Sequence, residues 1–235
     1  SVVKYTFVIE GIGAFFLTFY FVPLFGWANG LFTSIFLSIS AFNNAGFDNL
    51  GSTSLQAFVD SPIVNTVIPL LIIVGAIGFS VWFDVAKNFK SLISVRNWVE
   101  LKGRYRRLKL HTRLVINWTA GLIIAAMALF YFSEWNNSAT LGEMGLFDKL
   151  QATFFQAVTL RTAGFGTVGY PDLHLFTILF MTVFMFIGGS PGGTAGGAKT
   201  STVALVVKLI WAEITGQRYV HYQKRTIDTE IVQRA

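Results

Sequence analysis

The stretch that decides the fold occurs twice, as AFNNAGF at residues 41–47 and TLRTAGF at residues 159–165. Placed in one register, Gly46 lies over Gly164 and Asn44 over Thr162, an offset of 118 residues. Each copy follows an apolar segment of about half a membrane's thickness and is bracketed by two segments long enough to cross a bilayer. A short helix, a glycine-centred extended strand and two flanking spans together predict an ion-pore loop in each half of the chain.

The composition of the 235-residue chain predicts an integral membrane protein. Hydrophobic residues make up 53% of it and charged residues 13%, whereas a soluble domain has about 25% charged residues. The sequence contains no cysteine, which excludes disulfides, thiolate nucleophiles and zinc–thiolate sites within these residues.

Basic residues are concentrated in two regions, and this gives the chain an orientation. Residues 87–113 hold nine Lys and Arg, residues 22–66 hold none, and residues 133–175 hold only Lys149 and Arg161. Basic loops that alternate with nearly base-free ones follow the positive-inside rule, which explains the net charge of +6 without a nucleic-acid partner. We therefore expect the 87–113 loop to be cytoplasmic and both pore loops to open outward.

The hydropathy pattern predicts an all-α membrane protein with two tandem repeats of span, pore helix, filter loop and span. Spans are expected at Tyr5–Phe25, Ile63–Val85, Leu114–Phe132 and Leu173–Gly189; re-entrant helices at Leu31–Phe42 and Leu146–Leu160; and extended returns at Asn43–Gly51 and Arg161–Gly169. The predicted organisation is a first repeat at 1–90, a basic cytoplasmic linker at 91–112, a second repeat at 113–216 and a further linker at 217–235. Because the chain starts without Met and residues 226–235 resemble the start of a helix, we expect it to be part of a longer protein.

A glycine-rich break interrupts the last predicted span at 188–198, and apolar helix resumes through Val203–Trp211. Gly costs about 1 kcal/mol and Pro about 3 kcal/mol inside a helix, so this segment is not ordinary helix. Irregular backbone at membrane depth must be buried in protein or line a wet cavity, so we expect this loop to face the pore. Its residues are Gly188, Gly189, Ser190, Pro191, Gly192, Gly193, Thr194, Ala195, Gly196 and Gly197, followed by Ala198 and Lys199.

The paired AGF motif suits a filter made of backbone carbonyls. Successive carbonyls turn to the same side only if the backbone alternates between right- and left-handed conformations, and Gly takes the left-handed ones without a Cβ penalty. We assign this role to Gly46 and Gly164. The expected K⁺ ligands are the carbonyls of Asn44, Ala45, Gly46, Thr162, Ala163 and Gly164. The alternative is that each glycine merely ends a helix. That alternative would explain a single copy of the motif, but it explains two equivalent copies less well.

Three motifs in this order resemble the Trk/Ktr/HKT superfamily of potassium transporters: AFNNAGFDNLG (41–51), LRTAGFGT (160–167) and GGSPGGTAGGAKTST (188–202). The Ser-Pro in the third motif is most similar to bacterial Ktr-type pore subunits. The resemblance covers nearly the whole chain. It implies four repeats in a full-length chain, with one filter glycine each, so that the present residues would be the middle two.

The resemblance also implies the setting in which such a chain works. It implies a multi-pass protein of the bacterial inner membrane, a homodimer in the lipid bilayer, and a cytoplasmic ring of nucleotide-binding subunits that controls permeation. It further implies that residues 188–198 form an intramembrane gate beneath the filter. The transported ion would be K⁺, with Na⁺ as the second ion to test, and we expect no organic cofactor in this chain.

Three charged residues near these motifs leave alternatives open. Arg161 either faces the pore or turns away as an anchor of the filter strand, and we favour an anchor bound to an outer acid such as Glu143, Asp148 or Asp172. Lys199 acts either as a movable positive plug or marks the resumption of helix with its ammonium turned to the cytoplasm, and we favour the second. Glu10 is expected to be an interfacial charge, with ion coupling as its alternative.

The leading hypothesis is a pore-forming subunit for potassium uptake. The alternative is a two-repeat cation channel that dimerises to complete a four-fold pore. A membrane scaffold or a membrane enzyme is a third hypothesis, but no nucleophile, base or carboxylate pair is placed for catalysis, and we expect no enzyme.

Overall fold

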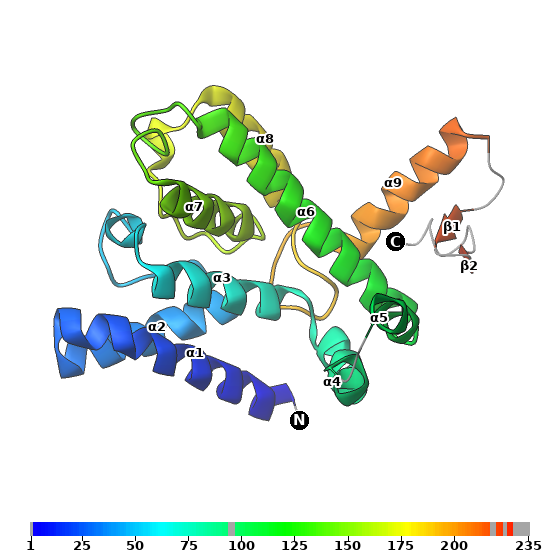
Figure 1. Cartoon of the computed structure of the whole chain (residues 1–235), viewed down its shortest axis with the longest axis horizontal. Helices are drawn as coiled ribbons and strands as arrows, with labels where there is room; N and C mark the ends of the chain where they lie inside the picture. Colours follow the sequence, from blue (N-terminus) through cyan, green and yellow to red (C-terminus); the bar gives the residue numbers. More distant parts are fainter. Residues whose placement is uncertain (1, 94–96, 217–219, 223–224, 228–235) are drawn as a thin grey trace.

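The computed structural model describes residues 2–93, 97–216, 220–222 and 225–227, and within these residues it is almost entirely helical (Figure 1). Two helices, Val2–Phe25 and Leu110–Glu134, are long and apolar enough to cross a membrane, and a third span results if one bent helix pair is counted. This confirms the predicted fold class, an all-α membrane protein. Most of the predicted 217–235 linker lies outside the described residues, apart from two short antiparallel strands, β1 (Val220–Tyr222) and β2 (Arg225–Ile227).

The first half is built from α1 (Val2–Phe25), α2 (Trp27–Phe42), the short 3-10 helix η1 (Gln56–Phe58) and α3 (Pro62–Ala76). Only Gly26, with φ of 79°, separates α1 from α2, which turns back along α1 and also packs on α3. The re-entrant helix begins four residues before the predicted Leu31. Gly30 lies within this extension, and its missing side chain lets α2 approach α1, because a Cβ there would lie 2.4 Å from the carbonyl oxygen of Phe21.

The second predicted span, Ile63–Val85, is wrong as a straight helix. Helix α3 ends at Ala76, and α4 (Phe79–Ile93) departs at an angle of 100°. The break contains Gly78, with φ of 90°. Hydropathy alone did not predict it, because the groups that end α3 come from the glycine-rich loop far along the chain, as described below.

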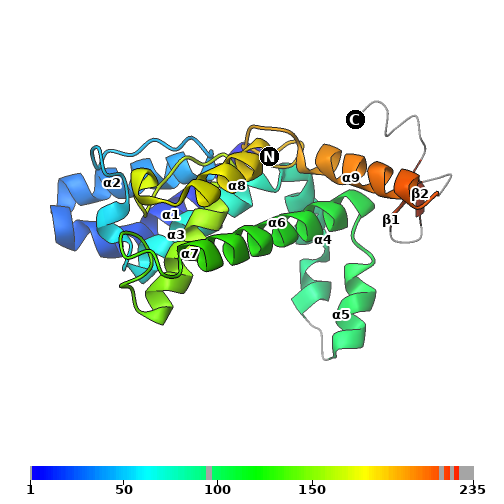
Figure 2. The same ribbon diagram turned by 90° about the horizontal axis from the view of Figure 1, so that it is seen from above.

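The second half repeats the same order with α6 (Leu110–Glu134), α7 (Leu146–Thr159), the 3-10 helix η2 (Tyr170–Asp172) and α8 (Leu175–Phe186). Helix α9 (Thr200–Ile214) follows the glycine-rich loop. The basic linker contains one helix that the sequence did not predict, α5 (Trp98–Tyr105). Figure 2 shows α4 and α5 projecting together from the layer formed by the longer helices.

The core lies where the two halves meet, because α3 packs against α7 as well as against α1 and α2. Fully buried aromatic and aliphatic side chains fill this region; they include Phe42, Ile68, Ile72, Phe155 and Phe165. The outward faces of the long helices expose large apolar residues such as Phe7, Phe15, Phe132 and Phe186. Such faces are suited to contact lipid tails or further membrane helices.

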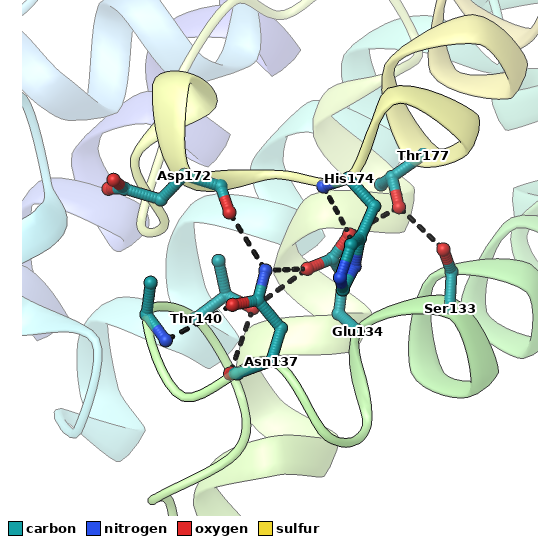
Figure 3. Close-up of polar contacts among 8 residues, drawn as sticks. Ser133, Glu134, Asn137, Thr140, Asp172, His174 and Thr177 are labelled. Carbon is teal, nitrogen blue, oxygen red and sulfur yellow. Dashed lines mark hydrogen bonds and ion pairs between the residues drawn. The ribbon is translucent and has the colours of Figure 1, made fainter.

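A buried carboxylate ties the C-terminal end of α6 to the start of α8 (Figure 3). Glu134 is fully buried and accepts hydrogen bonds from Asn137 Nδ2 (2.6 Å), Thr140 Oγ1 (2.9 Å) and the backbone N–H of His174 (3.0 Å). The hydroxyl of Thr177 also donates to Glu134. A carboxylate with this many donors is well compensated for its burial.

We expect Glu134→Gln to destabilise the protein by about 2–3 kcal/mol, because the new amide group faces donors that then lack an acceptor. Thermal unfolding in detergent, followed by size-exclusion chromatography, measures the effect. Glu143→Gln is the matched control, since Glu143 is an exposed acid on the same outer connection. Equal stability of the two variants would contradict the structural role of Glu134.

Candidate functional site

Both candidate filter strands, residues 43–51 and 161–169, alternate in backbone handedness. Asn44 and Gly46 have φ of 50° and 72°, while Thr162 and Gly164 have φ of 63° and 87°. These two left-handed positions therefore coincide in the two repeats, with one alanine between them in each, whereas Gly51 (φ of 100°) and its equivalent Gly169 (φ of −66°) differ. Left-handed backbone was expected at the two glycines alone. Asn44 and Thr162 were not expected to adopt it, although Asn is among the few residues that tolerate this conformation.

The two glycines meet where the two strands approach each other. A Cβ on Gly46 would lie 2.3 Å from the carbonyl oxygen of Ala163 and 3.0 Å from the Cα of Gly164. In the other direction, a Cβ on Gly164 would lie 3.3 Å from the Cα of Gly46. The structure thus brings the predicted ligands of the two repeats side by side, at a distance that leaves no room for side chains.

The residue that begins each strand turns away from the strand and bonds the opening span of its own repeat. Asn43 Nδ2 donates to Glu10 Oε1 at 2.8 Å, and Arg161 Nη2 donates to Thr119 Oγ1 at 3.2 Å. Asn43 and Arg161 are equivalent by the 118-residue offset. The two repeats therefore hold their filter strands in the same way, with different chemical groups.

The predicted partner of Arg161, an outer acid, is wrong. Its guanidinium is buried and bonds the hydroxyls of Thr119 on α6 and Thr200 on α9, and none of the three outer acids pairs with it. Glu10 is likewise buried within the protein, and its expected interfacial position stays a prediction. The error over the partner of Arg161 arises because hydropathy reports the depth of a segment and not the direction in which one side chain points.

The glycine-rich loop, residues 188–198, is compact, and its two ends pair in a parallel bridge between Ile187 and Ala198. Gly188 N donates to Ala198 O and Ala198 N donates to Phe186 O, both at 3.0 Å. A Cβ on Gly188 would lie 1.7 Å from the carbonyl oxygen of Gly196, so the two legs of the loop touch through their backbones. Glycine is required here because the legs approach too closely for a side chain.

This loop docks on the end of α3 and explains the bend between α3 and α4. Ser190 N donates to Ala76 O at 2.9 Å, and Thr194 N donates to Gly75 O at 3.1 Å. On the other side of the bend, Phe79 N donates to Gly192 O at 3.1 Å. The last carbonyls of α3 and the first amide of α4 thus find partners in the loop, and the helix can end within the protein.

The loop also touches both candidate filter strands. Asn44 Nδ2 donates to Thr194 Oγ1 at 2.8 Å, and Gly196 N donates to Thr162 Oγ1 at 2.9 Å. The Lys199 ammonium donates to the Ala195 carbonyl at 3.0 Å and so folds back on the loop. Lys199 immediately precedes α9, and its proposed role stays a prediction. All of these segments could be recognised in the sequence, but none of the contacts between them could.

Comparison with known proteins agrees with this arrangement. The chain is 39% identical over 227 residues to the Ktr system potassium uptake protein B of Bacillus subtilis, covering 97% of this chain and 48% of that one. It is 36% identical over 234 residues to the potassium/sodium uptake protein NtpJ of Enterococcus hirae, covering 100% and 48%. The chain therefore spans about half the length of the curated relatives it matches.

A solved structure shares the fold. The potassium transporter TrkH from Vibrio parahaemolyticus superimposes with a TM-score of 0.72 at 20% identity, over 99% of this chain and 46% of that one. At this identity the likeness concerns the fold alone. The TrkH family, described as cation transport proteins, matches residues 1–235 without a break. On that match, together with the identity to the two uptake proteins, the chain belongs to the TrkH family of cation transport proteins.

Proposed function

We propose that this chain forms part of the pore of a potassium uptake transporter, with its filter at residues 44–46 and 162–164. The observation that carries the proposal is the repeated left-handed pair, Asn44 with Gly46 and Thr162 with Gly164, in two strands that meet. Alternating handedness lets carbonyls replace the hydration shell of a cation. The proposed ion is K⁺ because the relatives are named potassium uptake proteins, and the name of one of them also includes sodium.

In this proposal the glycine-rich loop is the gate, and Arg161 anchors the second filter strand. The support is that the loop bonds both strands near their first residues, at Asn44 and Thr162, and also bonds the end of α3. Because the loop is held mainly by single hydrogen bonds to backbone carbonyls, it can leave without unfolding a helix. The ring of nucleotide-binding subunits and the homodimer, both implied by the family resemblance, would control that movement.

An uncovered face of α2 supports the presence of further repeats. Leu31, Ile35 and Ile39 are exposed, whereas their equivalents on α7, namely Lys149, Thr153 and Ala157, are buried. Helix α7 packs against α3 of the preceding repeat, and among the described residues α2 has no such neighbour on this face. A second pair of repeats, with the proposed boundaries 1–90 and 113–216 as the middle two of four, would provide it.

The same face is compatible with the alternative, a two-repeat channel that dimerises. In that case Leu31, Ile35 and Ile39 would contact a second copy of the chain. The length of the native polypeptide separates the two: about twice 235 residues supports four repeats in one chain, and a native chain of this length supports the dimer.

Rubidium uptake into liposomes, with Na⁺ as competitor, tests the proposal with the longest native form of the protein. Gly164→Ser is expected to lower the preference for Rb⁺ over Na⁺ about tenfold, because a shift of about 1.4 kcal/mol in relative binding is tenfold. Its added Cβ lies only 3.3 Å from Gly46 Cα, so the filter is reshaped and not blocked. Gly26→Ser is the control, since Gly26 also has a positive φ but no neighbour within 4 Å of its added Cβ. An unchanged ion preference in Gly164→Ser would refute the filter assignment.

A further inference from the structure

Two filter residues other than glycine adopt a left-handed backbone, which Asn tolerates but which is strained for Thr. Of the three non-glycine residues with positive φ among those described, two are Asn44 and Thr162, at equivalent positions of the two repeats. Threonine is β-branched, and a left-handed backbone is a true outlier for such residues. Strain of this kind persists only where the surrounding structure holds it in place. The question is therefore which groups hold these two residues.

In both repeats the answer is the glycine-rich loop. Asn44 donates its side-chain amide to Thr194 Oγ1 at 2.8 Å, and Thr162 accepts the backbone N–H of Gly196 on its hydroxyl at 2.9 Å. The two loop residues are only two positions apart, yet each bonds a different filter strand. Both hydrogen bonds are made by the side chain of the left-handed residue, Asn44 or Thr162. Each bond therefore fixes the position of the residue whose backbone must stay left-handed.

Thr194 is the centre of this arrangement. Its hydroxyl accepts from Asn44 and donates to the carbonyl of Phe42, the last residue of α2, at 2.8 Å, while its backbone N–H donates to Gly75 O at 3.1 Å. The packing around it is tight, because a Cβ on Gly75 would lie 1.9 Å from Phe42 O and 2.7 Å from Thr194 Oγ1. One loop residue, through its side chain and its backbone N–H, thus connects the pore helix, the filter strand and the closing helix of the first repeat.

We propose that Thr194 is a positioning residue that couples the shape of the filter to the position of the loop. With the loop seated, Thr194 and Gly196 keep Asn44 and Thr162 left-handed and the filter carbonyls aligned. When the loop leaves, both left-handed residues lose their hydrogen bonds and relax, so the filter discriminates less between K⁺ and Na⁺. This inference rests on the proposed filter and gate. It adds that the alignment of the filter carbonyls and the position of the loop change together.

The coupling has a reciprocal consequence. If the position of the loop changes the affinity of the filter for an ion, then that ion must change the equilibrium of the loop by the same factor. Potassium in the filter, which favours aligned carbonyls, is therefore expected to hold the loop in place more firmly than sodium does.

The test compares Thr194→Val, which removes the hydroxyl, with Thr194→Ser, which keeps it, in the longest native form of the protein. We expect Thr194→Val to raise Rb⁺ uptake and to lower the preference for Rb⁺ over Na⁺ at least threefold, and Thr194→Ser to restore both. Thr202→Val is the matched control, because Thr202 lies in α9 outside the loop. Raised uptake with an unchanged ion preference would overturn the coupling and leave the gate intact. Absence of Rb⁺ uptake in every folded preparation would instead refute the proposed function.

A second readout does not depend on transport. The 235-residue chain contains no cysteine, so Gly196→Cys provides a single thiol within it, and the added Cβ has no neighbour closer than 3.8 Å. We expect a water-soluble maleimide to modify this thiol at least threefold more slowly in KCl than in NaCl. The difference should disappear when Thr194→Val is added. Equal rates in the two salts, in protein that elutes as a single species, would overturn the proposal.

Discussion

Gly46→Ala is expected to abolish selective Rb⁺ uptake. Each 1.4 kcal/mol of strain that the substitution adds to the barrier for permeation lowers the uptake rate about tenfold. The added Cβ would lie 2.3 Å from the carbonyl oxygen of Ala163, which is one of the proposed ion ligands in the other repeat. That oxygen is backbone and cannot rotate aside, so the second strand must move. In addition, the φ of 72° costs an L-residue about 1–2 kcal/mol.

Gly51→Ala separates these two causes. Gly51 ends the same strand and has φ of 100°, but an added Cβ there has nothing within 4 Å. We expect this variant to bear the backbone strain and still transport Rb⁺ selectively. If Gly46→Ala transports as well as Gly51→Ala does, the contact between the two strands is not part of the permeation path.

Deletion of residues 190–196 is expected to produce the second large effect, a rise in K⁺ and Rb⁺ flux of at least about tenfold. The deleted segment contains Thr194 and Gly196, which bond the two filter strands, and Ser190, which bonds the end of α3. Each such hydrogen bond contributes only about 0.5–1.5 kcal/mol. The helices, which are held by apolar packing, should therefore survive the loss.

Liposome flux measured beside size-exclusion elution checks this deletion. Gly193→Ala provides a milder form of the same experiment, because its added Cβ would lie 2.6 Å from Ala76 O and push the loop off α3. Gly121→Ala in α6 is its control, since nothing lies within 4 Å of the added Cβ. Unchanged flux in a deletion variant that elutes like the parent would exclude these residues as the gate.

Much of the fold could be predicted because its signals are local. A span is recognised by its length and hydropathy, and a re-entrant helix by being too short to cross. These rules located α1, α6 and α7 to within a few residues, and the offset between Gly46 and Gly164 located both filter strands. Where a local rule failed, as at the bend after Ala76, the cause was a contact with a distant segment. The functional roles of the filter, the loop and Arg161 stay predictions until the transport experiments are done.

The sequence by itself determined the class of the protein, its two repeats and the segments in which function is concentrated. Composition, the repeat offset and the motif spacing can all be read from the linear sequence without any contact between distant residues. Only the tertiary structure decided which groups those segments bond. Asn44 meets Thr194 across 150 residues, and Thr194 meets Phe42 across 152. Arg161 bonds two threonine hydroxyls where spacing pointed to an acid. Hydrogen-bond partners are selected by direction and by burial in three dimensions, and neither quantity is present in a linear pattern.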